Sequence, residues 1–509
     1  MKKLPIGISN LKEIIEQRYV YVDKTEIAFN LINSGKYYFL SRPRRFGKSL
    51  FLDTLDEIFQ GNKELFENLY IYDMYEFTKY PIIRFSFNDG RMNSKDDLHR
   101  YIFELLDKNQ RDLDVKCPEN FTLSGCFKRL IEEAFKKYNK RVVILIDEYD
   151  KPILDNIENK EIARELREEL KGFYSVIKGS DEYLKFVFLT GVSKFSKVSL
   201  FSGLNNLNDI TIDKNYSTIC GYTQSDIENK FKEHLKDQDF DKIKEWYNGY
   251  KWLGESVYNP FDILLFIQKG FVFDNYWFTT GTPAFLMKLI EKNDYFLPNL
   301  ENLIVNKTML DSFDIDDIKL EILLWQTGYL TIDEQFDFFD EVRYRLKIPN
   351  KEVKISLMSS VVEFLTKNSS IEYKDNIKLA LFNENTDELF NSIKALYAAI
   401  PYNLFTKNKM YKYEGYYVSV FYSYLKALGL EIIGEDVTNK GRIDITVILP
   451  KIIYIIEFKT DGKNSIEQIK EKKYHEKYID RNKKIILLGI EFEKKQRNVV
   501  NIKSEEIVK

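Results

Sequence analysis

Two stretches of this 509-residue chain combine residue types and spacing that could act on phosphate groups. The first, SRPRRFGKSL (41–50), ends as a phosphate-binding loop does, with glycine followed by Lys48 and Ser49. In such a loop, successive backbone N–H groups surround the β-phosphate at a helix N-terminus, while the lysine adds positive charge and the hydroxyl ligates Mg²⁺. The usual pattern GxxxxGK[ST] has glycine where this chain has Arg42, which cannot adopt a positive φ cheaply, and Pro43 lacks an N–H donor. We therefore expect the early part of the loop to differ from a standard phosphate-binding loop.

An acidic pair about a hundred residues later could complete a nucleotide site. VVILIDEYD (142–150) places Asp147 and Glu148 directly after an apolar run. In P-loop ATPases with an extra strand in the sheet, the strand-end Asp holds the Mg²⁺ shell and the adjacent Glu polarises the attacking water. Alone, the acidic pair also fits a helix cap or a solvated turn, and GKS alone fits a plain strand-to-helix turn. Together, at this separation, they favour a nucleotide site.

Further polar residues near these motifs have two interpretations each. The run FVFLTGV ends in Thr190 and is followed by Ser193, where a hydroxyl could contact the γ-phosphate or cap a helix. Arg44 and Arg45 lie inside the loop and could act on phosphates as an internal arginine finger or bind acidic partners. The sequence leaves both alternatives open.

The second stretch is GRIDITVILPKIIYIIEFKT (441–460). Asp444 lies on one predicted strand, and Glu457 and Lys459 lie two positions apart on the next, so these two share a face. Two carboxylates that hold Mg²⁺, and a lysine that orients or deprotonates the attacking water, are what phosphodiester hydrolysis needs. Asp444 joins that face if antiparallel pairing sets position 444 opposite 457, which a turn at Pro450 and Lys451 permits.

Residues on both sides of this stretch fit the same site. Glu414 precedes the helix leading into the motif and could supply another carboxylate, while Gln468 and Tyr474 lie on the helix that follows, which would face nucleic acid. An isolated E-x-K pattern fits a surface salt bridge on a hairpin better than a metal site. Together with GRID before it, Glu414 further upstream and QIKEKKY after it, the pattern favours a metal site. The predicted metal ligands are Glu414, Asp444 and Glu457, and the predicted catalytic residues are Asp444, Glu457 and Lys459.

The elements that must position the first site form an α/β pattern over residues 1–220. Helical stretches such as SLFLDTLDEIF and REELKGFYSVI separate short, nearly continuous apolar runs, which predicts a parallel sheet covered on both faces. The predicted strands are KYYFLS (36–41), PIIRFSF (81–87), VVILIDEY (142–149) and YLKFVFLTGV (183–192).

The rest of the chain divides into two further predicted domains. Residues 221–400 are mainly helical, with DIENKFKEHLKD, NPFDILLFIQ, TPAFLMKLIEK and DIKLEILLWQ, followed by β-like pieces GYLTID and YRLKIP. Residues 401–509 form a compact α/β unit in which a helix, the strands RIDITVIL and KIIYIIEF, another helix and the strand KKIILLGIEF follow one another.

Composition indicates a well-packed globular protein, with 44% hydrophobic and 30% charged residues. We find no apolar run approaching the ~20 residues of a membrane helix and no signal peptide, so we expect a cytoplasmic protein without membrane attachment. The three cysteines and three histidines form no CxxC or HxxxH cluster, which argues against zinc. We expect Cys117 and Cys126 to be two ordinary thiols.

Charge is distributed unevenly along the chain. The net charge of −3 argues against a general polyanion binder. Residues 401–509, however, hold 21 Lys and Arg against 15 Asp and Glu, a balance of +6, which leaves −9 for the first 400 residues. This asymmetry fits an end that faces nucleic acid, and equally a solvated lysine-rich surface.

Several long motifs carry a family resemblance: RPRRFGKS, ILIDEYDKPI, FVFLTGVSKFSKVSLFSGLNNL, WYNGYKW and YWFTTGTPAFL. From near Leu4 to about residue 490, the chain resembles the predicted AAA-type ATPase family of bacteria and archaea, whose members carry a C-terminal PD-(D/E)XK nuclease-like domain. The RPRRFGKS form of the loop is usual in that family. Ile443 stands where the literal Pro-Asp pattern has proline.

The resemblance implies ATP and Mg²⁺ as cofactors. It implies that Ser49 and Asp147 hold the nucleotide-bound Mg²⁺ and that Glu148 acts in hydrolysis. The predicted nucleotide-binding residues are Arg45, Phe46, Gly47, Lys48, Ser49, Asp147 and Thr190.

The sequence therefore predicts an ATPase of the P-loop NTPase class joined, through a helical or winged-helix-like middle, to a restriction-endonuclease-like α/β domain. ATP binding or turnover would gate cleavage of nucleic acid, with DNA as the expected partner and the oligomeric state left open. Two alternatives remain: a nucleotide-dependent switch that binds nucleic acid or a partner without cutting, and a nuclease in which the loop is only structural.

Overall fold

The computed structural model describes residues 1–118, 121–194, 206–278, 286–287, 289–290, 297–301, 303–311, 313–366, 374–400, 414–460 and 465–507. The chain divides into two compact units. The first comprises Met1–Trp277 and Ile304–Asn350, and the second comprises Phe278–Leu303 and Lys351–Lys509. Each unit is therefore built from two separate stretches of sequence.

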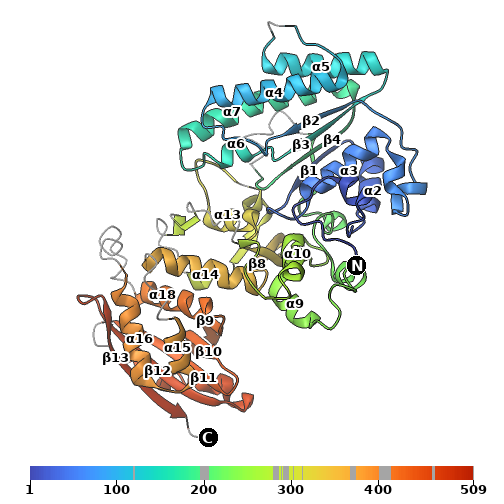
Figure 1. Ribbon diagram of the computed structural model, residues 1–509. Coiled ribbons are helices and arrows are strands. Elements are labelled where there is room, and N and C mark those ends of the chain that lie inside the picture. The colour runs from blue at the N-terminus through green and yellow to red at the C-terminus, as the bar shows by residue number, and fades with distance from the viewer. Residues whose placement is uncertain are drawn as a thin grey trace. The chain divides into compact units, whose positions relative to one another are not determined.

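The core of the first unit is a parallel sheet of five strands: β1 (Tyr37–Ser41), β2 (Ile82–Ser86), β3 (Val142–Asp147), β4 (Leu184–Gly191) and β5 (Asn208–Asp209). The strand order is β2-β3-β4-β1-β5, and every neighbouring pair is parallel (Figure 1). Every residue of β1 and β3 is buried, which explains their continuous apolar sequences. The four predicted strands and the parallel arrangement are confirmed.

Helices cover both faces of this sheet. Helix α3 (Lys48–Gln60) lies on one face, and α4 (Lys95–Leu113), α5 (Leu123–Tyr138) and α7 (Lys160–Lys178) lie on the other (Figure 1). The side chains of Ser94, Thr122 and Asn159 accept hydrogen bonds from the first turns of α4, α5 and α7, so each helix begins where the sequence supplies a cap. The shorter helices of this region are α1 (Leu11–Glu16), α2 (Thr25–Ser34) and α6 (Lys151–Leu154), with 3-10 turns at Lys63–Phe66, Tyr70–Asp73, Asp181–Tyr183 and Lys214–Tyr216. Within the ranges given above, no helix is both long and apolar enough to cross a membrane.

Strand β4 separates the two strands that carry the predicted nucleotide motifs. Leu40 of β1 pairs with Thr190, and Ile146 of β3 pairs with Leu189. Parallel strands end at the same edge of a sheet, so the residues that follow β1, β3 and β4 meet at one place. This edge positions the first candidate site.

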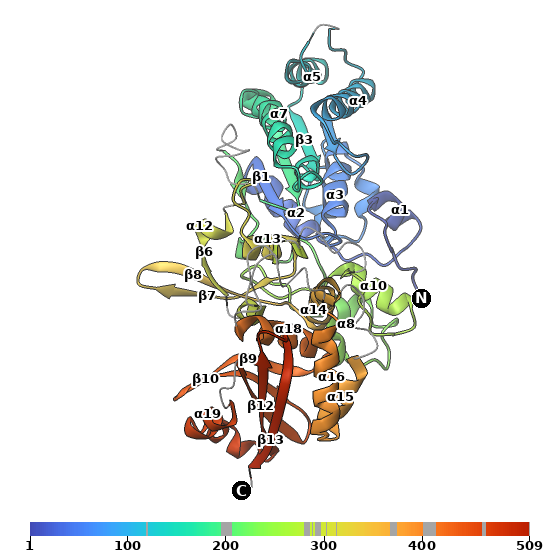
Figure 2. The same cartoon turned by 90° about the vertical axis from the view of Figure 1, so that its left-hand side faces the viewer.

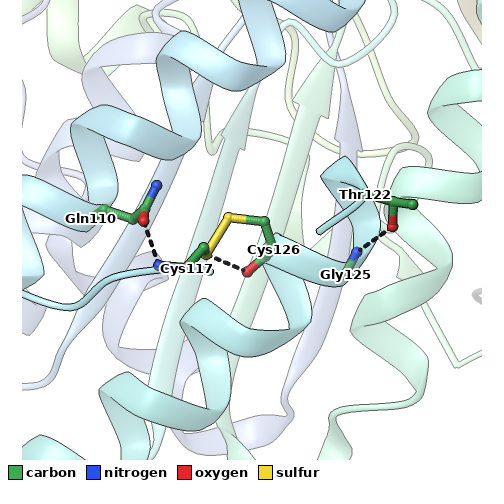
Figure 3. The surroundings of a disulfide bond; sticks show 5 residues. All are labelled: Gln110, Cys117, Thr122, Gly125 and Cys126. Atoms are coloured by element: carbon green, nitrogen blue, oxygen red, sulfur yellow. Dashed lines mark hydrogen bonds between the residues drawn. A yellow bond between two sulfur atoms is a disulfide. The ribbon is translucent and has the colours of Figure 1, made fainter. Parts of the chain in front are cut away.

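The two cysteines of the α4–α5 connection differ from expectation. Figure 3 shows Cys117 and Cys126 joined by a disulfide, with Cα atoms 5.5 Å apart. The Cys117 N–H donates to Gln110 Oε1 at 2.6 Å, which folds the connection back over the end of α4, and the start of α5 brings Cys126 beside it. The prediction of two separate thiols is wrong because motif spacing does not report how two adjacent helix ends approach each other. Cys220 is a buried free thiol.

The remainder of the first unit contains the helices α8 (Gln224–Lys230), α9 (Phe240–Tyr247), α10 (Pro260–Gln268), α12 (Lys307–Leu310) and α13 (Leu320–Thr327). Of these, α8, α10 and α13 overlap predicted helical stretches. An aromatic and aliphatic core that includes Phe231, Tyr247 and Phe266 holds α8, α9 and α10 together. The predicted β-like pieces are the antiparallel hairpin of β7 (Thr331–Phe338) and β8 (Glu341–Lys347), which forms a small sheet with β6 (Leu303–Asn306). Most of the helix predicted at TPAFLMKLIEK lies outside the described residues.

The second unit contains a mixed five-stranded sheet made of β9 (Glu431–Thr438), β10 (Gly441–Ile448), β11 (Ile452–Thr460), β12 (Lys484–Glu493) and β13 (Asn498–Ile507). The order is β13-β12-β11-β10-β9; β11 and β12 are parallel, and the other pairs are antiparallel. The central β11 is almost entirely buried, consistent with its apolar run IIYIIEF. The α/β prediction for this region is confirmed, although β9 and β13 were not among the predicted strands.

Helices lie on both faces of this second sheet. In Figure 2, α19 (Ser465–Glu471) lies on one side, and α15 (Lys374–Phe382) and α16 (Thr386–Ala398) lie on the other. The 3-10 helix η9 (Tyr474–Arg481) follows α19 and adds Tyr474 and Tyr478 to a core with Ile453 and Ile455 of β11. Odd-numbered side chains of β11 therefore face α19 and η9. The unit also contains α14 (Lys351–Thr366), α18 (Glu414–Ala427) and the 3-10 helix η6 (Leu297–Glu301).

A buried ion pair holds η6 within the second unit. Lys426 of α18 is almost fully buried and donates to Glu301 Oε1 at 2.5 Å and to the Ile432 carbonyl at 2.8 Å. Lys354 of α14 lies 3.3 Å from the same Glu301 oxygen. Because a buried charge is costly without a partner, these contacts attach η6 firmly to the later part of the chain.

Candidate functional site

The loop 42–47 connects β1 directly to α3, as a phosphate-binding loop requires. Gly47 precedes α3 with a φ of 95°, and its carbonyl accepts the first helical hydrogen bond from Phe51 at 3.0 Å. Arg45 also has a positive φ, 69°, whereas Arg42 does not. The chain therefore reverses direction late in the loop, and position 42 does not use the conformation that would require glycine.

Lys48 lies inside the loop. Its side chain is 6% exposed, and Nζ donates to the carbonyls of Arg42 and Pro43, each at 3.0 Å. Burial lowers the pKa of Lys48 below its usual range, and the carboxylates of Glu148 and Asp147 oppose that shift. The ammonium is thus held between the start of the loop and the acidic pair.

The acidic pair lies at the end of β3, as the sequence predicts. Asp147 is buried, and its Oδ1 accepts from the Glu148 N–H at 3.1 Å. Glu148 is half-buried with a φ of 49°, a conformation that costs a non-glycine residue energy and occurs often at functional sites. Burial raises the pKa of Glu148, while Lys48 opposes this change.

Asn88, just after β2, is a site residue that the sequence analysis missed. With its amide nitrogen toward Glu148, Nδ2 lies 2.8 Å from Oε2 and 3.1 Å from Oε1, and its carbonyl oxygen accepts from Ser86 Oγ at 3.0 Å. Asn88 can therefore orient the Glu148 carboxylate. A signal existed in the sequence, because the run PIIRFSF is followed by polar residues as the β3 run is, and both strands end at one sheet edge.

Thr190 and Ser193 have different environments. Thr190 is fully buried, and its hydroxyl oxygen has no hydrogen-bond partner within the described part of the chain, so it can accept or donate to a ligand. Ser193 Oγ instead donates to Asp150 Oδ2 at 2.6 Å, and the Ser193 N–H donates to the same oxygen at 2.6 Å. Ser193 thus anchors the chain after β4, and Thr190 is the residue of the two that is free to meet a nucleotide.

The remaining predicted loop residues are distributed around the start of α3. Ser49 is half-buried at the second position of the helix. Phe46 is buried against Tyr250 and Trp252, with ring centroids 4.7 and 5.5 Å away. Arg44 and Arg45 are exposed, and the Arg45 guanidinium lies 4.8 Å from the ring of Phe261.

The second site forms on one face of β10 and β11. Ile445 pairs with Ile456, so one step further along the antiparallel register sets Asp444 opposite Glu457, as the spacing predicts. Asp444 Oδ2 accepts from the Phe458 N–H at 2.8 Å, which ties the two strands together at this point. Burial, followed by the facing Asp444, raises the pKa of Glu457, and burial also raises that of Asp444. The two carboxyl groups therefore lie close together in a buried environment.

Lys459 lies beside this pair. Its Nζ is 3.6 Å from Glu457 Oε2 and donates to Glu414 Oε1 at 3.0 Å and to the Phe458 carbonyl at 2.9 Å. Burial alone lowers the pKa of Lys459, but Glu414 and the two facing carboxyl groups outweigh it and raise the pKa. Glu414, predicted as a further metal ligand, lies at the start of α18 and bonds to this lysine.

Gln468 and Tyr474 complete the cluster from the helical side. Gln468 Nε2 donates to Glu457 Oε2 at 3.0 Å, whereas Glu457 Oε1 is buried without a partner among the described atoms. Tyr474 OH interacts with Gln468. It also occupies the space above Gly441, where an added Cβ would lie 2.8 Å from the hydroxyl. A side chain at position 441 would therefore displace Tyr474.

The donor set fits a magnesium ion with few protein ligands. Over the described ranges, no group of three or more His, Cys, Asp or Glu is arranged to hold a metal. Mg²⁺ is usually bound by one or two carboxylates and keeps several waters. Asp444 and the unpaired Oε1 of Glu457 would provide two such carboxylates.

Asp436 of β9 is a buried residue that the sequence analysis did not identify. Its carboxylate accepts from Thr446 Oγ1 at 2.8 Å and from the side chains of Lys477 and Tyr478. These bonds fasten η9, and with it Tyr474, against β9 and β10. The polar sequence of β9 (EIIGEDVT) gave no sign of this role.

Comparison with known proteins agrees with both halves of this description. A family model described as "Predicted AAA-ATPase" matches residues 5–201, and one described as "PD-(D/E)XK nuclease superfamily" matches residues 412–502. An uncharacterized protein in the vnfD 5′ region of Azotobacter chroococcum mcd 1 is 46% identical over 514 residues, covering 99% of each chain. No solved structure matches. The chain therefore belongs to the predicted AAA-ATPase family, with a C-terminal domain of the PD-(D/E)XK nuclease superfamily.

Proposed function

We propose that this chain hydrolyses phosphodiester bonds of DNA in its second unit, with Mg²⁺, and that ATP binding and hydrolysis in its first unit control the cleavage. The observation that carries the proposal is the meeting of Asp444, Glu457, Lys459 and Gln468 on one face of β10 and β11, with Glu457 Oε1 unpaired. A salt bridge on a hairpin needs only Glu457 and Lys459, so the additional buried groups favour a catalytic site.

Each side chain of the second site has a distinct role. Asp444 and Glu457 would hold Mg²⁺, which when bound polarises the scissile phosphate and lowers the pKa of a water. Gln468 donates to Glu457 Oε2, which would leave Oε1 available to the ion. Lys459, paired with Glu414, enters as an ammonium and donates hydrogen bonds to the attacking water or the phosphate.

The proposed ATP site uses residues at or just after the ends of four neighbouring strands, β2, β3, β4 and β1. The N–H groups at the start of α3 and the Lys48 ammonium would bind the phosphates, and Ser49 and Asp147 would hold the nucleotide's Mg²⁺. Glu148, oriented by Asn88, would accept a hydrogen bond from the attacking water. The Thr190 hydroxyl would contact the γ-phosphate or that water.

The direct test is cleavage of linear and circular DNA by the purified full chain, with Mg²⁺ or Mn²⁺ and with or without ATP. Matched RNA substrates show whether the protein cleaves DNA or RNA. A control with a metal chelator shows whether the cleavage depends on the added metal or comes from a contaminating nuclease. Metal-dependent DNA cleavage that changes with ATP supports the proposal. A clean protein that binds ATP and DNA but cuts neither nucleic acid would favour the nucleotide-dependent switch instead.

Gln468 offers a prediction about metal affinity. We expect Gln468→Ala to raise the Mg²⁺ concentration for half-maximal cleavage by about 10- to 100-fold, because it removes the donor that orients Glu457. Cleavage rates across a Mg²⁺ titration measure this, with the exposed Gln496→Ala as the matched control. A lower rate at every Mg²⁺ concentration with an unchanged midpoint would show that Gln468 acts on the substrate, not through Glu457.

A further inference from the structure

Arg42 stands at the glycine position of the usual loop pattern, and its side chain is fully buried. Its Nη1 donates to the carbonyls of Ser41 at 2.9 Å and Thr211 at 2.8 Å, and Nη2 donates to the carbonyl of Tyr216 at 3.2 Å. The guanidinium thus reaches the segment that follows β5.

The indole of Trp252 covers the other side of this guanidinium. The Arg42 Cζ lies 4.0 Å from the ring centroid, a short cation–π contact. The same indole packs edge-to-face against Phe46, with centroids 5.5 Å apart. Trp252 therefore contacts the loop 42–47 at Arg42, its first residue, and at Phe46, near its end.

These contacts fix the backbone that holds Lys48. The Arg42 N–H continues the pairing of β1 with β4 by donating to the Gly191 carbonyl at 3.2 Å, and the Ser41 N–H donates to Thr211 Oγ1 at 3.1 Å. The Arg42 and Pro43 carbonyls, fixed in this way, accept from Lys48 Nζ. The position of the ammonium thus depends on the conformation at residues 42 and 43.

A glycine-based loop obtains its shape from backbone freedom, but Arg42 has no positive φ. Glycine at this position would remove the three hydrogen bonds and the indole contact without relieving any strain. Burial lowers the pKa of Arg42 to about 10, so the guanidinium stays charged at neutral pH. Backbone carbonyls accept from Nη1 and Nη2 and the indole covers the guanidinium, while Nε is buried without a partner among the described residues.

We propose that Arg42, at the position of the first glycine of the usual loop, is a positioning residue for nucleotide binding. Its contacts with Trp252 and with the Thr211 and Tyr216 carbonyls hold the loop backbone that binds Lys48. This inference rests on the proposed ATP site. It explains why the loop has arginine where the usual pattern has glycine. In this role Arg42 acts through Lys48, whose Nζ donates to the Arg42 carbonyl, and not by contact with the nucleotide.

The decisive variant is Arg42→Gly, which restores the sequence GxxxxGKS. We expect it to raise the Kd for ATP at least about tenfold, since it loses several buried hydrogen bonds. Arg42→Lys keeps the positive charge but loses the planar set of guanidinium N–H donors, so this variant should also bind ATP poorly. Added methylguanidinium should restore part of the ATP binding to Arg42→Gly but none to Lys48→Ala. The exposed Arg18→Gly serves as the matched control.

A second pair of variants covers the case in which Arg42→Gly does not fold. Trp252→Phe keeps an aromatic face and should bind ATP nearly as the wild type does, whereas Trp252→Ala should not. ATP affinity of Arg42→Gly or Trp252→Ala equal to that of the wild type would overturn the role of Arg42. Failure of the wild type itself to bind ATP would instead refute the proposed nucleotide site, so the two failures are distinguishable.

Discussion

Replacing Glu457 with glutamine is expected to reduce metal-dependent cleavage by more than about 100-fold, a loss larger than that expected for the outer residue Gln468. Glutamine keeps the size of the side chain, but its neutral amide cannot supply the negative oxygen that the proposed Mg²⁺ site would require of Oε1. The measurement is the single-turnover cleavage rate of the full chain at saturating Mg²⁺, with the melting temperature recorded for each variant.

The matched control is Glu431→Gln, the same substitution at an exposed position at the start of β9. We expect this control to cut DNA as the wild type does. Cleavage by a folded Glu457→Gln protein at the wild-type rate would show that the carboxylates of β10 and β11 form a structural pair and that cutting, if present, occurs elsewhere. Loss of cleavage together with a lowered melting temperature would call for Asp444→Asn as an independent variant of the same pair.

Replacing Lys48 with alanine is expected to weaken ATP binding by about 10- to 150-fold, corresponding to ~1.5–3 kcal/mol for hydrogen bonds to a charged group. Thermal stabilisation measures this without any enzymatic activity. At an ATP concentration 100 times the wild-type Kd, the wild type gains about 2.7 kcal/mol, whereas a variant with 100-fold weaker binding gains only about 0.4 kcal/mol. In the cleavage assay, the variant should lose the ATP-dependent part of the activity and keep the rest.

Lys48→Ala leaves the Arg42 and Pro43 carbonyls without their donor, so the melting temperature without ATP must be compared as well. The exposed Lys12→Ala on α1 is the control for removing a lysine. Unchanged ATP affinity in Lys48→Ala would mean that the loop is a structural turn. That result would place ATP binding, and any nucleotide control of the second unit, outside this loop.

Much of the second site was predictable because strand geometry constrains it tightly. Glu457 and Lys459 are two positions apart on one strand, so their side chains must lie on the same face of the sheet. Asp444 lies on that face only if an even-numbered residue of its strand pairs with an odd-numbered residue of β11. The pairing of Ile445 with Ile456 satisfies this condition. The apolar runs of β10 and β11 were long enough to fix both strands, so the site followed from local patterns.

The residues that were missed depend on contacts between elements. Asn88 reaches Glu148 only because β2 lies beside β3, which sequence periodicity does not reveal. Asp436 lies on a strand whose alternation is interrupted by Gly434, and two of its three partners, Lys477 and Tyr478, follow it by 41 and 42 residues. Side-chain partners across such distances depend on tertiary packing, which no local pattern encodes.

Arg42 shows a different limit of sequence reasoning. The sequence shows a large charged residue where the usual pattern has glycine, and the structure buries this side chain against Trp252 with hydrogen bonds to three carbonyls. The expected penalty for a positive φ at this position does not arise, because the positive φ values occur at Arg45 and Gly47. The departure from the glycine pattern was predictable, and its structural solution was not.

The division of the chain into interleaved units has a consequence for its synthesis on the ribosome. Glu301 of η6 is made 125 residues before its buried partner Lys426. At ~5–20 residues per second, roughly 6–25 s pass before that partner is translated. During this interval the segment Phe278–Leu303 is tethered between parts of the first unit while its own unit does not yet exist. Truncation at a single position cannot separate the two units, because any cut between Trp277 and Lys351 removes part of one of them.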